Sequence, residues 1–183
     1  MTINENKFTD LQERGLCFEP EKSCLSFLSQ LGISYEGLTH DEADTIEKCE
    51  KIEESLGAKI AKNLFLCNSQ KTSFYLLIMP GDKIFKTKYL SKQINSSRLS
   101  FADAENMKKY LGLRPGSVSI LGLKNDMEKK VKLIIDRDLL SLEYVGFHPC
   151  INTSTLKLRL TDVLNKFLPA VNSEPITVDL PGE

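Results

Sequence analysis

The chain has 183 residues, of which 41% are hydrophobic and 27% charged, and this balance excludes a disordered main body. No apolar run approaches the ~20 residues that a membrane-spanning helix needs. At this length we expect one domain over residues 1–183, with an N-terminal extension over 1–19 and a C-terminal tail over 172–183. Residues 1–6 are polar and lack a secretory signal pattern, so we expect a cytoplasmic protein without membrane contact.

The formal net charge is −1, which excludes a general electrostatic attraction to nucleic acid but not a local basic patch. Two lysine-rich segments, 83–92 and 124–132, are the candidates for such a patch. The simpler interpretation of both is a solvated face. If RNA binds, its recognition must then depend on a few placed lysines and on shape.

Five cysteines and two histidines are the residues that could bind a metal or form disulfides. The cysteines are widely spaced without a C-x-x-C pair, and two histidines cannot supply a multi-histidine site. We therefore expect no metal, no cofactor and no disulfide framework, and most cysteines should be buried small hydrophobes. Cys150 lies two residues after His148, which leaves a cysteine nucleophile as a minor alternative without an evident orienting acid.

In chain order, the first predicted element is a helix over 20–31, because a proline suits its first turn, apolar residues recur at helical spacing and a glycine follows. A short strand over 33–38 should come next. Asp44 and Glu47 have the spacing of a capping box, which predicts a second helix that ends at Gly57.

The following segment predicts a hairpin and two more helices. Residues 63–67 and 73–79 are apolar runs on either side of a polar turn, which is typical of two buried strands. A short helix over 86–93 should follow. A further helix, capped by Ser100 or Asp103, should end at the next glycine.

Four strands are then predicted, over 117–121, 130–136, 143–147 and 155–160, before a final helix that Thr161 should cap. Helices that precede and interrupt a strand-rich second half, without strict alternation of strand and helix, indicate an α+β fold with a mixed or antiparallel sheet. The tail over 172–183 contains two prolines and little periodicity, so we expect a docked or loose extension.

Three local features could carry chemistry. The first is Lys62, followed by Asn63, in an apolar strand. Its ammonium either reaches the sheet edge or is held over a cleft, where it would suit a phosphate or a carboxyl-derived oxygen. The second is the segment 116–122, whose bracketing glycines allow close backbone approach while Ser117 and Ser119 offer hydroxyls. An ordinary edge strand explains this second feature equally well.

The third feature is the segment 146–155, where Gly146, His148, Pro149 and Asn152 gather at the end of a strand. Such residues rarely build a core, and they suit a loop whose backbone groups and polar side chains contact a ligand. The alternative is a surface turn whose polar side chains bond their own backbone.

Four segments, taken in order, are similar to the YbaK family, also called the prolyl-tRNA synthetase associated domain. They are 61–66 (AKNLFL), 98–102 (RLSFA), 111–119 (LGLRPGSVS) and 147–153 (FHPCINT). The resemblance spans residues 25–168 and is strongest to the free-standing branch that deacylates alanyl-tRNA(Pro). It implies a mixed sheet curled toward a barrel and flanked by helices. It also implies a pocket for the terminal adenosine of the tRNA and its aminoacyl ester.

The resemblance assigns roles to individual residues. Lys62 would be the pocket lysine of the family and Asn63 its neighbour, while Gly146 and His148 would lie in the loop that lines the aminoacyl group. We expect Lys62, Gly146 and His148 to act in catalysis, and the substrate-binding residues to be Asn63, Ser117, Ser119, Pro149 and Asn152. The family also implies attack by a water that the substrate's own ribose hydroxyl assists. Because an ester is already activated, orientation and oxyanion stabilisation can supply much of the rate enhancement.

The chain departs from the family in one place. The family continues the Gly-Ser-Val segment with Thr-Pro-Phe-Gly, whereas this chain has Ser119-Ile120-Leu121-Gly122. The absent proline removes a backbone constraint beside the pocket, which could alter specificity or mark a protein with weak or no deacylase activity.

The leading hypothesis is hydrolysis of alanyl-tRNA(Pro), in which a small pocket refuses larger residues on steric grounds. One alternative is a non-catalytic module that binds the acceptor end of an aminoacyl-tRNA, or a synthetase such as prolyl-tRNA synthetase. The other is a deacylase for a different mischarged pair, such as cysteinyl-tRNA(Pro).

Overall fold

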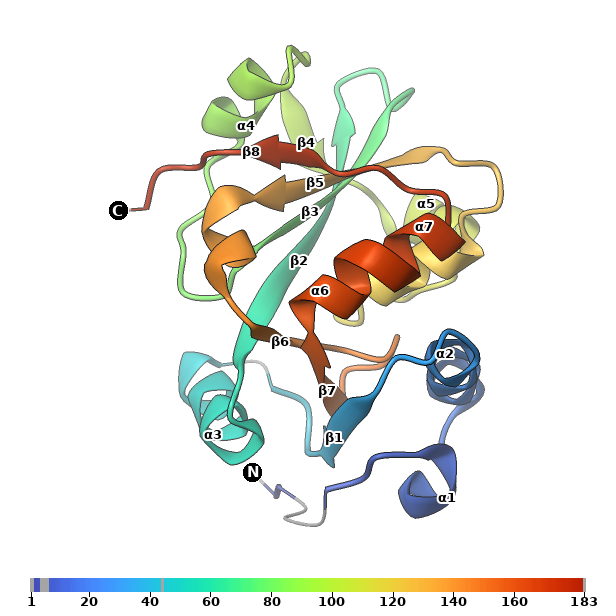
Figure 1. Cartoon of the computed structure of the whole chain (residues 1–183). Coiled ribbons are helices and arrows are strands. Elements are labelled where there is room, and N and C mark those ends of the chain that lie inside the picture. The colour runs from blue at the N-terminus through green and yellow to red at the C-terminus, as the bar shows by residue number, and fades with distance from the viewer. Residues whose placement is uncertain (1, 4–6, 44, 183) are drawn as a thin grey trace.

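The computed structural model of the chain describes residues 2–3, 7–43 and 45–182, and within them one mixed sheet of eight strands (Figure 1). Along the sheet the strands are β1 (Tyr35–Thr39), β7 (Ser154–Arg159), β6 (Tyr144–Phe147), β2 (Lys59–Asn68), β3 (Phe74–Pro80), β5 (Val131–Asp136) and β8 (Ile176–Val178), and the short β4 (Leu99–Phe101) pairs with the end of β2. The helices are α1 (Leu11–Arg14), α2 (Glu19–Gln30), α3 (Ile46–Leu56), α4 (Thr87–Gln93), α5 (Ala104–Leu111), the 3-10 helices η1 (Ile120–Asn125) and η2 (Arg137–Ser141), and the continuous C-terminal helix α6 (Leu160–Asp162), η3 (Val163–Phe167, a π-helix) and α7 (Leu168–Ala170). The predicted α+β fold, a curled mixed sheet flanked by helices, is confirmed.

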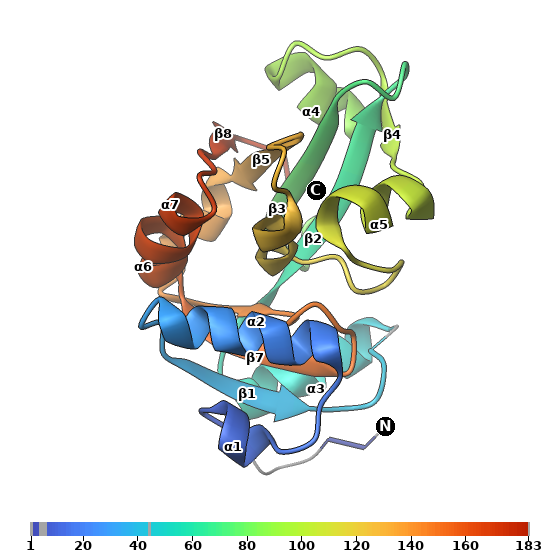
Figure 2. The same cartoon turned by 90° about the vertical axis from the view of Figure 1, so that its right-hand side faces the viewer.

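Strand β2 joins the two halves of the sheet, because its two ends pair with different neighbours. At its start, Ile60 lies opposite Gly146 of β6 in a parallel ladder. Further along, Lys62 lies opposite Met79 of β3 in an antiparallel ladder. Figures 1 and 2 show β1, β6 and β7 at one end of β2 and the group β3, β4, β5 and β8 at the other. Residues near the start of β2 therefore lie where the two halves meet.

The two faces of β2 are buried in different clusters. Side chains at odd positions, such as Phe65, belong to the main hydrophobic core with α2, α5, η1 and the C-terminal helix. Leu64, at an even position, packs against a smaller cluster that includes residues of α4 and β8. Ile60 belongs to a third cluster, with α3 and β1. Because side chains alternate along a strand, the neighbours Lys62 and Asn63 point to opposite faces.

The predicted helices and the hairpin of the first half are present, with ends shifted by a few residues. α2 begins at Glu19, one residue before its proline. The Thr45 hydroxyl caps α3 by accepting a hydrogen bond of 3.3 Å from the backbone N–H of Lys48. Asp44, the predicted cap, lies outside the described residues. Gly57 ends α3 in the left-handed conformation, with φ 68° and ψ 36°, as predicted.

Two predicted caps are resolved by the structure. The carboxylate of Asp103 caps α5. Ser100, the other candidate, lies in β4, which the hydrophobic pattern does not predict because only Leu99 of this strand is buried. The predicted cap of the last helix is wrong. This helix begins at Leu160, before Thr161, and no side chain caps it.

The predicted strand over 117–121 is also wrong, because this segment forms a turn and the start of η1. Gly116 has a positive φ of 86°, and the Ser119 hydroxyl caps η1 by accepting a hydrogen bond of 3.2 Å from the N–H of Leu121. All residues from 120 to 123 are buried. A strand would point alternate side chains to opposite faces, whereas this helical turn places consecutive apolar residues in the core.

Segments near both ends of the chain dock on the sheet. The C-terminal tail is docked rather than loose, because 176–178 form β8 alongside β5 and Leu180 is buried. Near the other end, the backbone of Phe8 pairs with Gly37 of β1, and the ring of Phe8 fills the space that a side chain at position 37 would need. None of the described helices combines the length and the apolar character that a bilayer crossing requires.

Candidate active site

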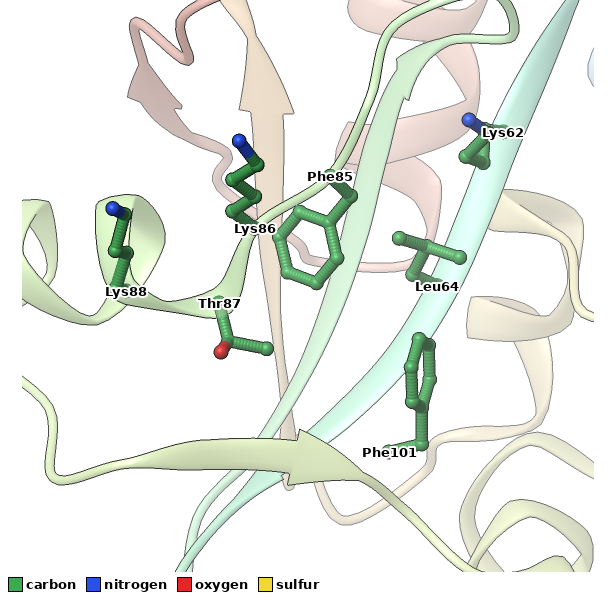
Figure 3. A pocket seen from close by; sticks show the side chains of 7 residues that line it. All are labelled: Lys62, Leu64, Phe85, Lys86, Thr87, Lys88 and Phe101. Atoms are coloured by element: carbon green, nitrogen blue, oxygen red, sulfur yellow. The ribbon is translucent and has the colours of Figure 1, made fainter.

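Lys62 is half-buried on the α4 face of β2, beside the loop that follows β3 (Figure 3). Its ammonium donates a hydrogen bond of 2.7 Å to the backbone carbonyl oxygen of Lys83. Burial lowers the pKa of Lys62, and the nearby carboxylate of Asp82 opposes this shift. A partly desolvated ammonium of this kind is a suitable partner for a phosphate or an ester oxygen.

The loop that holds Lys62 is itself anchored by a buried ion pair. The Nζ atom of Lys83 lies 2.8 Å from Oδ2 of Asp136 and 2.7 Å from Oδ2 of Asp138. The side chains of Lys83 and Asp136 are 6% and 0% exposed, whereas that of Asp138 is 62% exposed. The Asp136 carboxylate, at the end of β5, therefore fixes the carbonyl that orients Lys62.

A groove with a volume of about 650 Å³ extends from Lys62 between β2 and the start of α4, and we call it the β2–α4 groove (Figure 3). Its lining residues are Lys62, Leu64, Phe85, Lys86, Thr87, Lys88 and Phe101. This lining carries three lysines and no carboxylate, although the whole chain has a net charge of −1. The first of the two lysine-rich segments therefore contributes a local basic surface.

On the other side of the junction, His148 and His40 lie close together, with ring centroids 6.3 Å apart. Nδ1 of His148 lies 2.9 Å from the carbonyl oxygen of Ser154, and Nδ1 of His40 lies 2.8 Å from that of Asp41. Because a carbonyl oxygen can only accept, Nδ1 of each ring must carry a proton. In the neutral ring Nε2 is then the acceptor, and Nε2 of His40 accepts from the Thr155 hydroxyl at 2.8 Å.

Both histidines are set to be neutral near pH 7. Burial lowers the pKa of His40 and of His148 from the ordinary 6.5. The neighbouring His40 lowers the pKa of His148 further, while the bond to the Ser154 carbonyl opposes the shift. Within the described part of the chain, no protein group bonds Nε2 of His148. Its lone pair is therefore able to accept a proton from a substrate hydroxyl or a water.

Position 146 has little room for a side chain. A Cβ atom on Gly146 would lie 3.1 Å from Cγ1 of Ile60 and 3.3 Å from Cγ2 of Thr155. Thr155 is the residue whose hydroxyl contacts both histidines, at 2.8 Å and 3.4 Å. The glycine therefore lets β6 pack tightly between β2 and the threonine that aligns the histidine pair.

The pairing of β2 with β6 relates Lys62 to His148. Ile60 and Gly146 form the last pair of the parallel ladder, and Lys62 and His148 each lie two residues further along. Lys62 is still within β2, whereas β6 ends at Phe147 and His148 begins the loop after it. Beyond this point β2 turns toward β3 while β6 continues into its loop (Figure 1). Of the two residues, only Lys62 lines the β2–α4 groove.

Asn63, Ser117 and Ser119 serve the loop before η1 and are not brought to Lys62. Oδ1 of Asn63 accepts a hydrogen bond of 2.9 Å from the N–H of Ile120, and its Nδ2 donates 2.9 Å to the carbonyl of Ala61. The Ser117 hydroxyl donates 2.8 Å to the carbonyl of Arg114, and Ser119 caps η1. These polar groups are therefore engaged within the protein.

The loop of Pro149 and Asn152 lies against this second loop. A Cβ atom on Gly116 would lie 3.6 Å from Nδ2 of Asn152. Pro149 is buried, whereas Asn152 is half-buried. The structure thus brings the predicted second and third features together, and the pairing of Ile60 with Gly146 connects the start of the Lys62 strand to the strand that precedes the third feature.

Cys150 is 4% exposed and faces Cys24 of α2. A hydrogen bond between the two thiols raises the pKa of Cys24 and lowers that of Cys150. A thiol buried against a helix in this way fits a packing role better than that of a nucleophile. No group of three or more His, Cys, Asp or Glu side chains that could hold a metal ion gathers among the described residues.

Four residues of this region received no individual role from the sequence, namely His40, Lys83, Phe101 and Thr155, although the last three lie in segments that the sequence singles out. His40 and Thr155 lie far from each other in the chain and meet only through the pairing of β1 with β7. Pairing also brings Phe101 opposite Leu66 of β2. For Lys83 a signal existed, since a lysine in an apolar neighbourhood between two strands is a candidate for burial with a carboxylate.

The chain matches the aminoacyl-tRNA editing domain family over residues 40–166 and belongs to that family. The enzyme class expected from the sequence, an aminoacyl-tRNA deacylase, is confirmed by this membership. The prolyl-tRNA editing protein ProX of Acetoanaerobium sticklandii is 34% identical over 145 residues, which cover 79% of this chain and 88% of that protein.

Two further comparisons agree. Prolyl-tRNA synthetase associated domain-containing protein 1 of Mus musculus is 32% identical over 156 residues, which cover 83% of this chain and 91% of that protein. A solved structure whose description refers to trans-editing for prolyl tRNA synthetase has a TM-score of 0.65 at 13% identity, and the match covers 91% of this chain and 100% of the other. At that identity the likeness concerns the fold alone.

Proposed function

We propose that this protein edits in trans, by hydrolysing the aminoacyl ester of a mischarged tRNA(Pro), and that alanyl-tRNA(Pro) is its main substrate. Relatives named for prolyl-tRNA editing and for the prolyl-tRNA synthetase associated domain support tRNA(Pro) as the tRNA of the substrate. The observation that carries the site is the parallel pairing of Ile60 with Gly146, because Lys62 follows the first and His148 the second by two residues.

In the proposed reaction, a water oxygen attacks the ester carbonyl carbon, and the bond to the ribose oxygen breaks with transfer of a proton to that oxygen. The ammonium of Lys62 binds an oxygen of the ester or of the adjoining phosphate and so orients the acylated ribose. The lone pair on Nε2 of His148 positions the neighbouring ribose hydroxyl, which assists the water. Gly146 keeps β6 close enough to β2 for Lys62 and His148 to contact the same acylated ribose.

The remaining predicted residues take supporting roles in this proposal. Pro149 and Asn152 shape the loop that contacts the aminoacyl group. Asn63, Ser117 and Ser119 hold the loop against which Asn152 lies, because their polar groups are already engaged there. Prolyl-tRNA synthetase is the proposed partner that supplies mischarged tRNA, and the cytoplasm is the proposed place of the reaction.

The test is release of free amino acid from alanyl-, cysteinyl- and prolyl-tRNA(Pro) by the purified protein and by Lys62→Ala. We expect hydrolysis of the alanyl ester and loss of most turnover in Lys62→Ala with its fold intact by circular dichroism. Lys59→Ala is the matched control, because this lysine of the same strand forms a surface ion pair with Glu53 at 2.8 Å. Unchanged turnover in Lys62→Ala contradicts the proposed site.

A second candidate function is a binding module without hydrolysis. It is favoured by Ile120, which stands where the family has a proline. The N–H of Ile120 bonds Asn63 at 2.9 Å, a contact that the proline of the family could not make. A preparation that binds alanyl-tRNA(Pro) tightly but releases no alanine would support this alternative. Faster release from the cysteinyl ester would instead support a deacylase with a different amino-acid preference.

A further inference from the structure

We propose that the β2–α4 groove binds the single-stranded 3′ end of the tRNA, with a base stacked on Phe101 and backbone phosphates held by the lysines of the groove. This inference rests on the proposed function, because it takes Lys62 as the point where the acylated ribose lies. It adds a binding surface for the nucleotides that precede the terminal adenosine.

The β2–α4 groove runs in the direction that a single-stranded RNA anchored at Lys62 requires. Phe101 lies opposite Leu66 in the antiparallel pairing of β4 with β2, so it is on the same face as Lys62 and Leu64. Four residues of strand separate positions 62 and 66, which corresponds to ~13 Å. Figure 3 shows Lys62 at one end, Phe101 at the other and Phe85 beside Leu64 between them. An RNA strand whose end lies at Lys62 would therefore run along the groove toward Phe101.

Phe101 is available for stacking. Its side chain is 64% exposed, although the residue opposite it, Leu66, is fully buried in the cluster beneath α4. Phe85 is partly buried and packs against the same cluster, so it supports the groove floor. An exposed aromatic ring beside lysines is how proteins hold unpaired bases, because every base has a π face and the phosphates need cations.

The charge of the lining favours nucleic acid over a protein partner. Lys62, Lys86 and Lys88 line the groove without any carboxylate among its lining residues. Lys88 is exposed, and its ammonium lies 4.8 Å from the ring centroid of Tyr89, the next residue of α4. A duplex would keep its base faces stacked inside, so the exposed ring selects an unpaired strand.

The first experiment compares Phe101→Ala with Phe18→Ala in the deacylation assay. Phe18 is the matched control, because it is 71% exposed and precedes α2, which lies at the opposite end of the molecule from α4 (Figures 1 and 2). We expect Phe101→Ala to raise KM about tenfold with little change in kcat, since loss of one stacked base weakens binding to that degree. Equal KM values for the two variants overturn the proposal.

Salt dependence tests the phosphate contacts. Lys88→Ala should reduce the slope of log Kd against log salt by about 0.7, the value for one phosphate contact to a single strand. Lys130→Ala, in the second lysine-rich segment, is the control and should leave the slope unchanged. If Lys130→Ala lowers the slope and Lys88→Ala does not, the tRNA end lies elsewhere.

A binding assay without an ester separates this inference from the proposed function. The chain contains no tryptophan, so Phe101→Trp introduces a single one, which can be excited separately from the five tyrosines. A single-stranded RNA oligonucleotide ending in CCA should quench this tryptophan, and a blunt RNA duplex should not. Quenching without any hydrolysis by the unsubstituted protein would support the groove and contradict the deacylase. Equal quenching of Phe101→Trp and Phe18→Trp would contradict the groove, whatever the protein hydrolyses.

Discussion

The ammonium of Lys62 donates a hydrogen bond of 2.7 Å to the carbonyl oxygen of Lys83, whose own ammonium lies 2.8 Å from the buried carboxylate of Asp136. The lysine proposed to bind substrate is thus oriented by a backbone carbonyl and not by a carboxylate. A carbonyl satisfies one of its three donors without neutralising its charge. The ammonium therefore remains available to an anionic substrate.

Lys83→Met should destabilise the protein by about 3–5 kcal/mol, because it leaves the Asp136 carboxylate buried without its partner. Urea unfolding followed by circular dichroism measures the change. Asp138→Asn is the control, since that carboxylate is 62% exposed and its removal should cost no more than about 1 kcal/mol. Similar effects for both substitutions would show that the burial of Asp136 does not matter.

Ile120→Pro should destabilise the protein by about 1 kcal/mol more than Ile120→Val, because only the proline removes the N–H that bonds Asn63. The backbone of Ser119 is extended, with φ −149° and ψ 147°, which suits a residue before proline. Ile120→Val controls for the smaller side chain in the core. Thermal or urea unfolding gives both values, and equal losses would mean that this hydrogen bond contributes little.

Gly146→Ala should cost about 1–3 kcal/mol of stability and lower kcat. The added Cβ would meet Ile60 at 3.1 Å and Thr155 at 3.3 Å, and a shift of Thr155 disturbs the bonds to both histidines. Gly182→Ala is the matched control, because its Cβ would have only an ordinary contact of 3.7 Å with Lys83. Activity and unfolding are measured for both variants. A fully active Gly146→Ala would contradict the role of this glycine in aligning the site.

Stability should fall as the pH drops below 6.5, because burial lowers the pKa of His40 and His148 in the folded state. The unfolded chain then binds protons that the folded chain excludes, so stability rises with pH across this window and is lost as pH decreases. Each histidine contributes up to about 1.4 kcal/mol per pH unit below its unfolded pKa. Deacylation should decline only at lower pH, where folded His148 itself takes up a proton and loses its lone pair, because its pKa is lowered.

The measurement is the free energy of unfolding at pH 7.5 and pH 5.5 for the unsubstituted protein and for His40→Asn. Asparagine keeps a donor toward the carbonyl of Asp41 but does not titrate. The difference between the two pH values should shrink in the variant. An unchanged difference would assign the pH dependence to groups other than this pair.

The linear sequence was sufficient for much of the local structure. α2, α3, α5 and the β2–β3 hairpin follow from apolar spacing and from the glycines that end two of the helices, since these signals act within a few residues. The family motifs also pointed to Lys62 and to the loop of His148. The strand predicted over 117–121 is wrong, because consecutive apolar residues fit either a buried strand or a helical turn. Only the surrounding core selects between the two.

Tertiary structure alone decided which polar groups meet. His40 and Thr155 come together through the pairing of β1 with β7, and Lys83 meets Asp136 through the packing of a loop on the end of β5. The opposite directions of Lys62 and Asn63 follow from strand alternation, but tertiary structure decided that the two faces of β2 join different buried clusters. Residue spacing fixes the direction of a side chain within its own element, but its partners depend on how distant elements are paired, and that pairing is set by the burial of the whole core.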